Sequence, residues 1–225
     1  MSDISFLRHT RSVHILGAGL NQDKPAHKAF QDMKDRGYRM VPVHPRDAGN
    51  TIQGLPIVPH PWASDKPELF VMFLSPDRTL GLLRKWLIAE RRIPFVWLQP
   101  GAESEAVADF LRETGVPHSI GKCWVVTSLE SDIYCENPIP NLPWVLQTTS
   151  TEGDECSVWR YFTPGSDYTL EEPLEWVGDL MDLEYSNEKI PSYIRSLVDD
   201  GETLVEAAQR LSCLLYTSPS PRDRG

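Results

Sequence analysis

Two patterns of apolar and polar positions alternate through the first half of the chain: short, largely apolar runs and apolar positions with helical spacing. They predict strands separated by helices. The run SVHIL at 12–16 is typical of a buried strand, and it leads into the glycine-rich stretch GAG at 17–19. A helix is expected from Pro25, because proline suits the first position of a helix, and Gly37 supplies its C-terminal stop. One face of this helix carries the apolar side chains Ala26, Phe30 and Met33.

The same alternation continues to about residue 126. A second strand is expected at 38–43, so that residues 12–43 have the size of one βαβ unit, and unbroken apolar runs predict further strands at 69–74, 95–98 and 118–120. A helix that starts at Pro76 should face the core with Leu80, Leu83 and Leu87. A later helix should begin after Ser104, bury Val107, Phe110 and Leu111, and end at Gly115. The fold class predicted for residues 1–126 is a doubly wound α/β domain with a mostly parallel sheet.

The pattern changes after Val126. Two apolar runs, at 143–149 and 156–162, predict a β-hairpin around the polar turn STEGDE. Two or three acidic helices are expected after it, within 170–185, 188–200 and 201–211. Residues 1–126 carry 16 Lys and Arg against 13 Asp and Glu, whereas residues 127–212 carry 4 against 18. This change of sign indicates a domain boundary near Val126, with 127–212 forming an acidic extension of hairpin and helices.

Composition narrows the class of protein. The net charge of −10 argues against general nucleic-acid binding. No apolar run is long enough to span a membrane, and the first residues lack the apolar core of a signal peptide, so a cytoplasmic protein with no membrane partner is expected. The four cysteines form no CxxC pair, which fits a reducing compartment.

The last thirteen residues, 213–225, break abruptly from the helical pattern before them. Their sequence CLLYTSPSPRDRG resembles a translated sequencing adapter. We therefore expect that 213–225 is not native and leave it out of the fold prediction.

The glycine-rich loop is typical of a phosphate site, because glycines after a strand let a phosphate approach the backbone at the next helix N-terminus. A NAD site would place an acidic side chain at the end of the second strand, but that strand is followed by His44, Pro45 and Arg46, and Asp47 comes too late. Arg46 could meet a phosphate on a ribose, and Lys24 and Lys28 flank the loop. These residues favour NADP or coenzyme A (CoA).

Six landmarks occur in the order and spacing of a known family. They are GAG followed by DKPAH, GYRMVPVHP at 37–45, Gly54, FLSP at 73–76, VWLQPG at 96–101, and Lys122-Cys123. Over residues 10–126 the chain resembles the stand-alone CoA-binding domain proteins, which are related to the N-terminal domain of the succinyl-CoA synthetase α subunit.

The resemblance implies a set of residues that bind CoA or acyl-CoA. Gly17, Ala18 and Gly19 with Lys24 would hold the pyrophosphate, and His44 and Pro45 would border the adenosine end. Ser75 and Gln99 would line the pantetheine side, together with Phe73 of the FLSP landmark. The chain departs from the family pattern by replacing a serine with Gly19, an arginine with Lys24, a serine with Ala26 and an asparagine with His44. Lys24 keeps the charge but loses the bidentate fork of arginine.

The sequence lacks the residues that several classes of enzyme would need for catalysis. A related CoA ligase would carry a phosphorylated histidine in a second domain, yet all six histidines lie within residues 1–118. The sequence contains no GxSxG elbow and no metal motif such as HExxH. Ser75 also fits a helix N-cap, and Cys123 fits a buried strand-end residue.

The leading hypothesis is a CoA or acyl-CoA binding module without catalytic residues, in a regulatory, carrier or protective role. The alternatives are an NADP-linked oxidoreductase, the N-terminal part of a truncated CoA ligase, and an interaction protein with a vestigial pocket. For the hypotheses that involve CoA or NADP, the expected partner is a small-molecule nucleotide. A protein partner could also bind the acidic extension 127–212, where Trp176, Met181 and Tyr185 supply apolar side chains.

Overall fold

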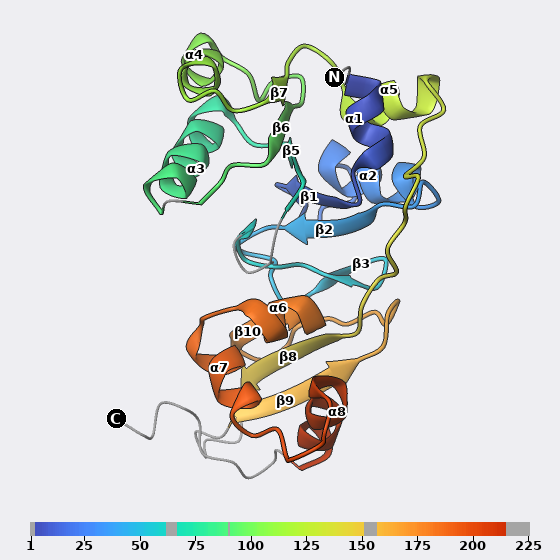
Figure 1. Cartoon of the computed structure of the whole chain (residues 1–225), viewed down its shortest axis with the longest axis vertical. Helices are drawn as coiled ribbons and strands as arrows, with labels where there is room; N and C mark the ends of the chain where they lie inside the picture. The colour runs from blue at the N-terminus through green and yellow to red at the C-terminus, as the bar shows by residue number, and fades with distance from the viewer. Residues whose placement is uncertain (1–2, 62–66, 90, 151–156, 215–225) are drawn as a thin grey trace. The chain divides into compact units, whose positions relative to one another are not determined.

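The computed structural model describes residues 3–61, 67–89, 91–150 and 157–214, and it divides into two compact units (Figure 1). The α/β unit consists of Met1–Val43 and Pro67–Pro140, and the second unit consists of His44–Lys66 and Asn141–Gly225. The chain therefore leaves the α/β unit after Val43 and returns to it at Pro67. Val126 lies inside a helix of the α/β unit, and the domain division expected there stays a prediction.

The α/β unit contains a five-stranded parallel sheet in the order β2-β1-β5-β6-β7. Every residue of β1, β2 and β5 is buried, as expected for strands covered on both faces, and only β5 of these three is apolar throughout. The strand bounds are Ser12–Leu16 for β1, Arg39–Val43 for β2, Leu69–Met72 for β5, Phe95–Leu98 for β6 and His118–Ser119 for β7. The predicted Rossmann-like fold class is confirmed.

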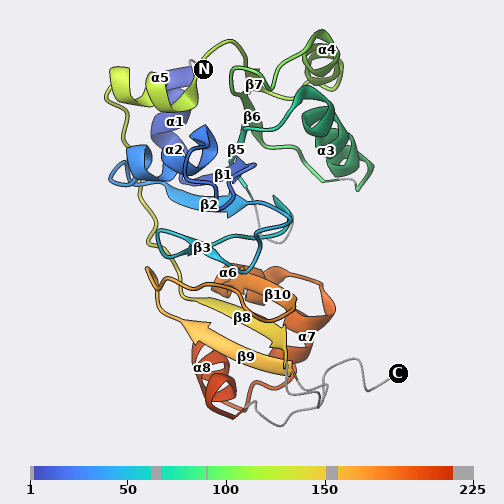
Figure 2. The same ribbon diagram turned by 180° about the vertical axis from the view of Figure 1, so that it is seen from behind.

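Helices cover both faces of this sheet. Figures 1 and 2 show α3 and α4 on one side and α1, α2 and α5 on the other. Their bounds are Asp3–His9 for α1, Pro25–Met33 for α2, Pro76–Ile88 for α3, Glu105–Glu113 for α4 and Trp124–Glu130 for α5. The expected inner face of α2 is confirmed, because Ala26, Phe30 and Met33 are all buried. Sequence periodicity did not predict α1 and α5, which have seven residues each.

The inner face of α3 differs from the expected one. The buried residues are Thr79, Leu83 and Trp86, whereas Leu87 is 46% exposed and Leu80 is half-buried. Trp86 packs edge-on against Phe70 of β5, with 5.0 Å between the ring centroids. The large indole therefore faces the sheet, and the helix is rotated away from the stripe that three leucines alone suggest.

The second unit is built on a three-stranded antiparallel sheet in the order β10-β8-β9. Strands β8 (Trp144–Thr149) and β9 (Ser157–Phe162) pair antiparallel, which confirms the predicted hairpin strands; part of the turn between them lies outside the described residues. A two-stranded ribbon of β3 (Thr51–Ile52) and β4 (Leu55–Pro56) belongs to the same unit.

The segment 170–185 is not the single helix that its sequence predicts. Leu174–Asp179 forms β10, and only Leu180–Tyr185 forms a helix, α6. Asp179 caps this helix in a capping box with Asp182, which fixes the point where the strand ends. The helical prediction for 174–179 is therefore wrong, because pairing with β8 outweighs the local preference of this segment.

Three short helices complete the second unit: α6, α7 (Lys189–Arg195) and α8 (Leu204–Leu214). Leu183, Ile194 and Ala208 of these helices join one apolar cluster with Trp159 and Trp176 of the sheet. Trp176 therefore belongs to the core, whereas Tyr185 is 49% exposed. Among the described helices, none combines the length and apolar character that a bilayer crossing requires. The residues expected to be an adapter, 213–225, lie almost entirely outside the described part.

Candidate functional site

The sequence-predicted glycine loop lies at the point where the strand order of the sheet reverses. β1 leads through α2 to β2 on one side, while β5 leads through α3 to β6 on the other, so the reversal falls between β1 and β5. Gly17 and Phe73 are the first residues after these two strands. In open α/β sheets, ligands bind outside the carboxyl ends of the strands at such a point.

Backbone contacts hold these strand ends together. The N–H of Gly17 donates to the carbonyl of Val43 at 2.9 Å, and the N–H of Phe73 donates to the carbonyl of Leu16 at 2.9 Å. Gly17 has a φ of +97°, and a β-carbon placed on it would lie 2.9 Å from the carbonyl oxygen of Phe73. Only glycine fits here without strain, so this position allows the ends of β1 and β5 to pack closely together.

The loop then turns into α2. Ala18 and Gly19 are buried, and the carbonyl of Gly19 accepts a hydrogen bond from Nδ1 of His27 at 2.9 Å. Asn21 accepts from the N–H of Asp23 through its side chain and from the N–H of Lys24 through its carbonyl. The contacts of His27 and Asn21 could not be predicted from the sequence, since neither follows from spacing.

The N-terminus of α2 is suited to an anion. Lys24 occupies the N-cap position with an extended backbone and is exposed, Pro25 follows it, and no side chain caps the helix. The first turn contains no acidic residue. The positive end of the helix and the ammonium group of Lys24 therefore lie on the same short segment.

The other side of the site is formed by the ends of β5 and β6. Phe73 is half-buried, and Ser75 is exposed at the N-cap of α3, where its side chain makes no capping hydrogen bond. Gln99 follows β6 directly and is only 3% exposed; its N–H donates to the carbonyl of Met72 at 3.2 Å. Within the described part of the chain, the Nε2 amide of Gln99 has no hydrogen-bond partner. An orphaned buried donor of this kind points to a missing acceptor.

The residues expected at the adenosine end belong to the second unit. His44 follows β2 directly, its N–H donates to the carbonyl of Val58 at 3.0 Å, and its Nδ1 lies 3.2 Å from a carboxylate oxygen of Asp47. Pro45 and Arg46 are exposed in the turn after it. The structure therefore groups seven of the ten predicted residues in the α/β unit, and the roles of His44, Pro45 and Arg46 stay predictions.

Comparison with known families identifies the class of protein that this fold and site define. The family model described as "CoA binding domain" matches residues 11–128, which is more than half of the chain. The protein belongs to this CoA-binding domain family. The expected resemblance is thereby confirmed, and the small-molecule ligand that the family indicates is a nucleotide.

Several solved structures are similar to about half of the chain. A protein from Thermus thermophilus is 26% identical, with a TM-score of 0.50, over 56% of this chain and 93% of its own. A conserved hypothetical protein from Pyrococcus furiosus is 29% identical over 52% of this chain and 98% of its own, with a TM-score of 0.48. A hypothetical protein from Pyrococcus horikoshii, at 18% identity and a TM-score of 0.50, covers 58% of this chain and 92% of its own, and it shows the fold alone.

The site residues fit a CoA ligand on two independent observations. The first is the start of α2, where the exposed Lys24 occupies the N-cap position without a side-chain cap and the first turn has no acidic residue. The second is the unpartnered amide of Gln99, a donor of the kind that an amide carbonyl of pantetheine would accept. The replacements Lys24 and Gly19 remove a guanidinium and a hydroxyl from the family pattern, so fewer directed hydrogen bonds are available to the pyrophosphate.

Proposed function

We propose that this protein binds CoA or an acyl-CoA at the carboxyl ends of its parallel strands and that its role is binding rather than turnover. The observation that carries the proposal is the uncapped start of α2, with Lys24 at its N-cap, after the loop that follows β1 at the reversal of the strand order. This arrangement supports a phosphate ligand, because backbone N–H groups and a helix N-terminus both favour a negative charge there.

Each part of the ligand would have its own partner in this proposal. The loop 17–19 and Lys24 would bind the pyrophosphate, and Gln99 would donate its amide hydrogen to pantetheine. Arg46 would meet the 3′-phosphate, with His44 and Pro45 beside the adenosine. Phe73 and Ser75 would lie along the pantetheine arm. Bound CoA carries acyl groups on its thiol, so the module would hold, deliver or sense them.

Calorimetric titration of the full chain with CoA, dephospho-CoA, acetyl-CoA and NADPH tests the proposal. We expect micromolar affinity for CoA and a loss of about tenfold without the 3′-phosphate, which corresponds to one lost charge-assisted contact of about 1.4 kcal/mol. NADPH should bind more weakly than CoA. Absence of CoA binding overturns the proposal, and preferential binding of NADPH replaces it with the oxidoreductase interpretation.

A second assay separates binding from turnover. The protein is incubated with acetyl-CoA, and the release of free thiol is followed with a chromogenic thiol reagent. The binding role predicts no release above the rate without protein. Protein-dependent release that saturates with acetyl-CoA contradicts it and makes the protein a thioesterase.

A further inference from the structure

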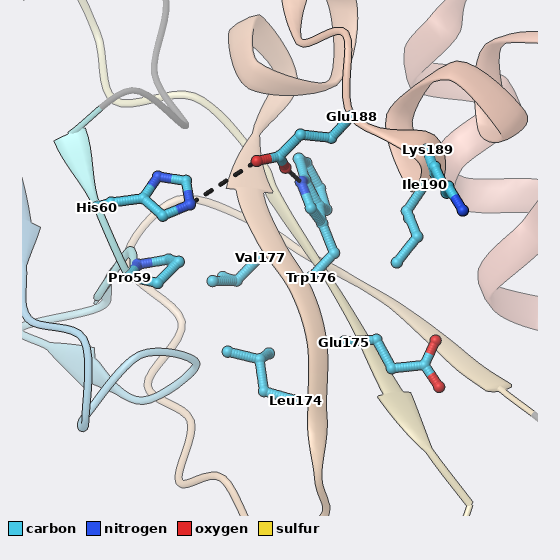
Figure 3. Close-up of a pocket in the computed structure, with 9 residues that line it drawn as sticks. All are labelled: Pro59, His60, Leu174, Glu175, Trp176, Val177, Glu188, Lys189 and Ile190. Atoms are coloured by element: carbon cyan, nitrogen blue, oxygen red, sulfur yellow. Dashed lines mark hydrogen bonds and ion pairs between the residues drawn. The ribbon is translucent and has the colours of Figure 1, made fainter. Parts of the chain in front are cut away.

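A pocket of about 390 Å³ lies in the second unit, along the outer edge of β10 (Figure 3). β10 is an edge strand, and its pairing register with β8 shifts between Leu174 and Trp176. Such a shift breaks the strict alternation of side chains, so neighbouring residues of the strand can reach the same pocket. The lining residues are Pro59, His60, Leu174, Glu175, Trp176, Val177, Glu188, Lys189 and Ile190.

Glu188 presents its carboxylate to this pocket. It occupies the N-cap position of α7, but its side chain does not cap that helix. One carboxylate oxygen accepts a hydrogen bond from Nε1 of Trp176 at 2.7 Å. The indole thereby fixes the direction of the carboxylate, and Figure 3 shows it turned toward His60.

The second carboxylate oxygen of Glu188 lies 3.8 Å from Nε2 of His60. This distance is too long for a direct hydrogen bond. An ammonium nitrogen that lies beside the pair can still donate to both atoms, because it carries several N–H donors and a neutral imidazole accepts at its unprotonated nitrogen. The pair therefore forms an acceptor site for a group with several N–H donors.

The rest of the pocket fixes the character of the ligand. Pro59, Leu174, Val177 and Ile190 supply apolar surface. Lys189 directs its ammonium group away from the His60–Glu188 pair (Figure 3). Glu175 adds a second negative charge, which is held in place by the side chains of Gln147, Thr149 and Ser157. A cation is favoured over an anion by both carboxylates and by the strongly acidic composition of 127–212.

We propose that this pocket binds a small organic amine, whose ammonium group donates to both Glu188 and His60 and whose short aliphatic body packs on Leu174, Val177 and Ile190. None of the nine lining residues is among the residues proposed to bind CoA. Neither proposal depends on the other.

The experiment is a proton–nitrogen correlation titration of the full-length, ¹⁵N-labelled chain with n-butylammonium, and with butyrate and n-butanol as matched probes. The indole N–H of Trp176, assigned through Trp176→Phe, reports on the pocket because it donates to Glu188. We expect a saturable shift of this signal with n-butylammonium in the millimolar range. Butyrate and n-butanol should give at most a tenth of that affinity.

Variants connect the shift to the pocket. Glu188→Gln should weaken n-butylammonium binding at least tenfold, and Ile190→Trp should abolish it by filling the pocket while Glu188 stays in place. Glu184→Gln, an exposed acid of the same unit, is the matched control and should leave the affinity unchanged. The proposal is overturned if n-butylammonium gives no saturable shift, if butyrate binds equally well, or if Glu188→Gln and Glu184→Gln have the same effect.

Discussion

Gly17 lies directly against the backbone of Phe73: a β-carbon on Gly17 would meet the Phe73 carbonyl oxygen at 2.9 Å. The two residues follow β1 and β5, the central strands of the α/β unit, and they border the point where the strand order reverses. Gly17 therefore allows the ends of these two strands to pack closely beside the proposed ligand site.

The first prediction concerns this contact. Gly17→Ala should lower the free energy of unfolding by about 2–4 kcal/mol, because alanine is strained at a φ of +97° and its methyl group collides with the Phe73 carbonyl. Urea unfolding followed by tryptophan fluorescence measures the loss. Gly115→Ala is the matched control, since Gly115 also has a positive φ, +68°, but nothing lies within 4 Å of its added β-carbon. An equal loss in both variants would show that the Phe73 contact contributes nothing.

The second prediction tests the cation at the start of α2. Lys24→Ala should weaken CoA binding about tenfold at low salt and by less at high salt, because an exposed ammonium group is screened. Lys34→Ala, at the other end of the same helix, should leave the affinity unchanged. Calorimetry at two salt concentrations measures both variants. Equal losses in the two variants would mean that only the net charge matters.

The strands of the α/β unit were predictable because their sequences are short and largely apolar, as burial on both faces requires. β5 is the clearest case, since its sequence LFVM is apolar throughout and all four residues are buried. β10 was not predictable in this way. Leu174–Asp179 forms a strand because it pairs with β8, a segment about 30 residues earlier in the chain. The sequence of 174–179 alone does not indicate this pairing.

The candidate site was predictable where the residue type or its position at a strand end indicates the local conformation. Gly17 has the positive φ that a glycine after a strand suggests, and Gln99 lies at the strand end where it was expected. The hydrogen bond from His27 to the Gly19 carbonyl was not predictable, because a histidine in the first turn of a helix has many possible partners. The His60–Glu188 pair joins residues far apart in sequence, and no motif links them.

The third prediction concerns His14, a fully buried residue of β1. Burial, together with the nearby positive charge of Arg39, lowers its pKa to about 3. Below about pH 6.5 the unfolded chain binds a proton that the folded chain does not take up until about pH 3, so acid destabilises the fold across that window. The contribution of His14 should be a loss of about 2 kcal/mol between pH 6.5 and pH 5.

Urea unfolding at several pH values isolates this contribution. His14→Leu removes the titrating group, so its stability should vary less with pH than that of the natural sequence, whatever its absolute value. His9→Gln serves as the control, because the side chain of His9 is 61% exposed whereas that of His14 is fully buried. If His14→Leu and the natural chain lose stability in parallel from pH 6.5 to pH 5, the pKa of His14 is not depressed.

The last prediction compares two buried glutamines that differ in their partners. Gln99 and Gln147 are each 3% exposed, but Nε2 of Gln147 donates to Glu175 at 2.7 Å, whereas Nε2 of Gln99 has no partner among the described residues. Gln147→Leu should therefore lower the free energy of unfolding by about 1–3 kcal/mol, because it leaves the Glu175 carboxylate short of a donor. Gln99→Leu should leave it unchanged or raise it by about 1 kcal/mol, because it removes an unsatisfied buried donor.

The same Gln99→Leu variant should weaken CoA binding, whereas Gln147→Leu should not. A residue that costs stability in the free protein and contributes affinity in the complex is one kept for its ligand. Thermal unfolding measures the stability of the two variants, and calorimetry measures their affinity for CoA. If Gln99→Leu is destabilised as much as Gln147→Leu, Gln99 stabilises the fold and is not kept for a ligand.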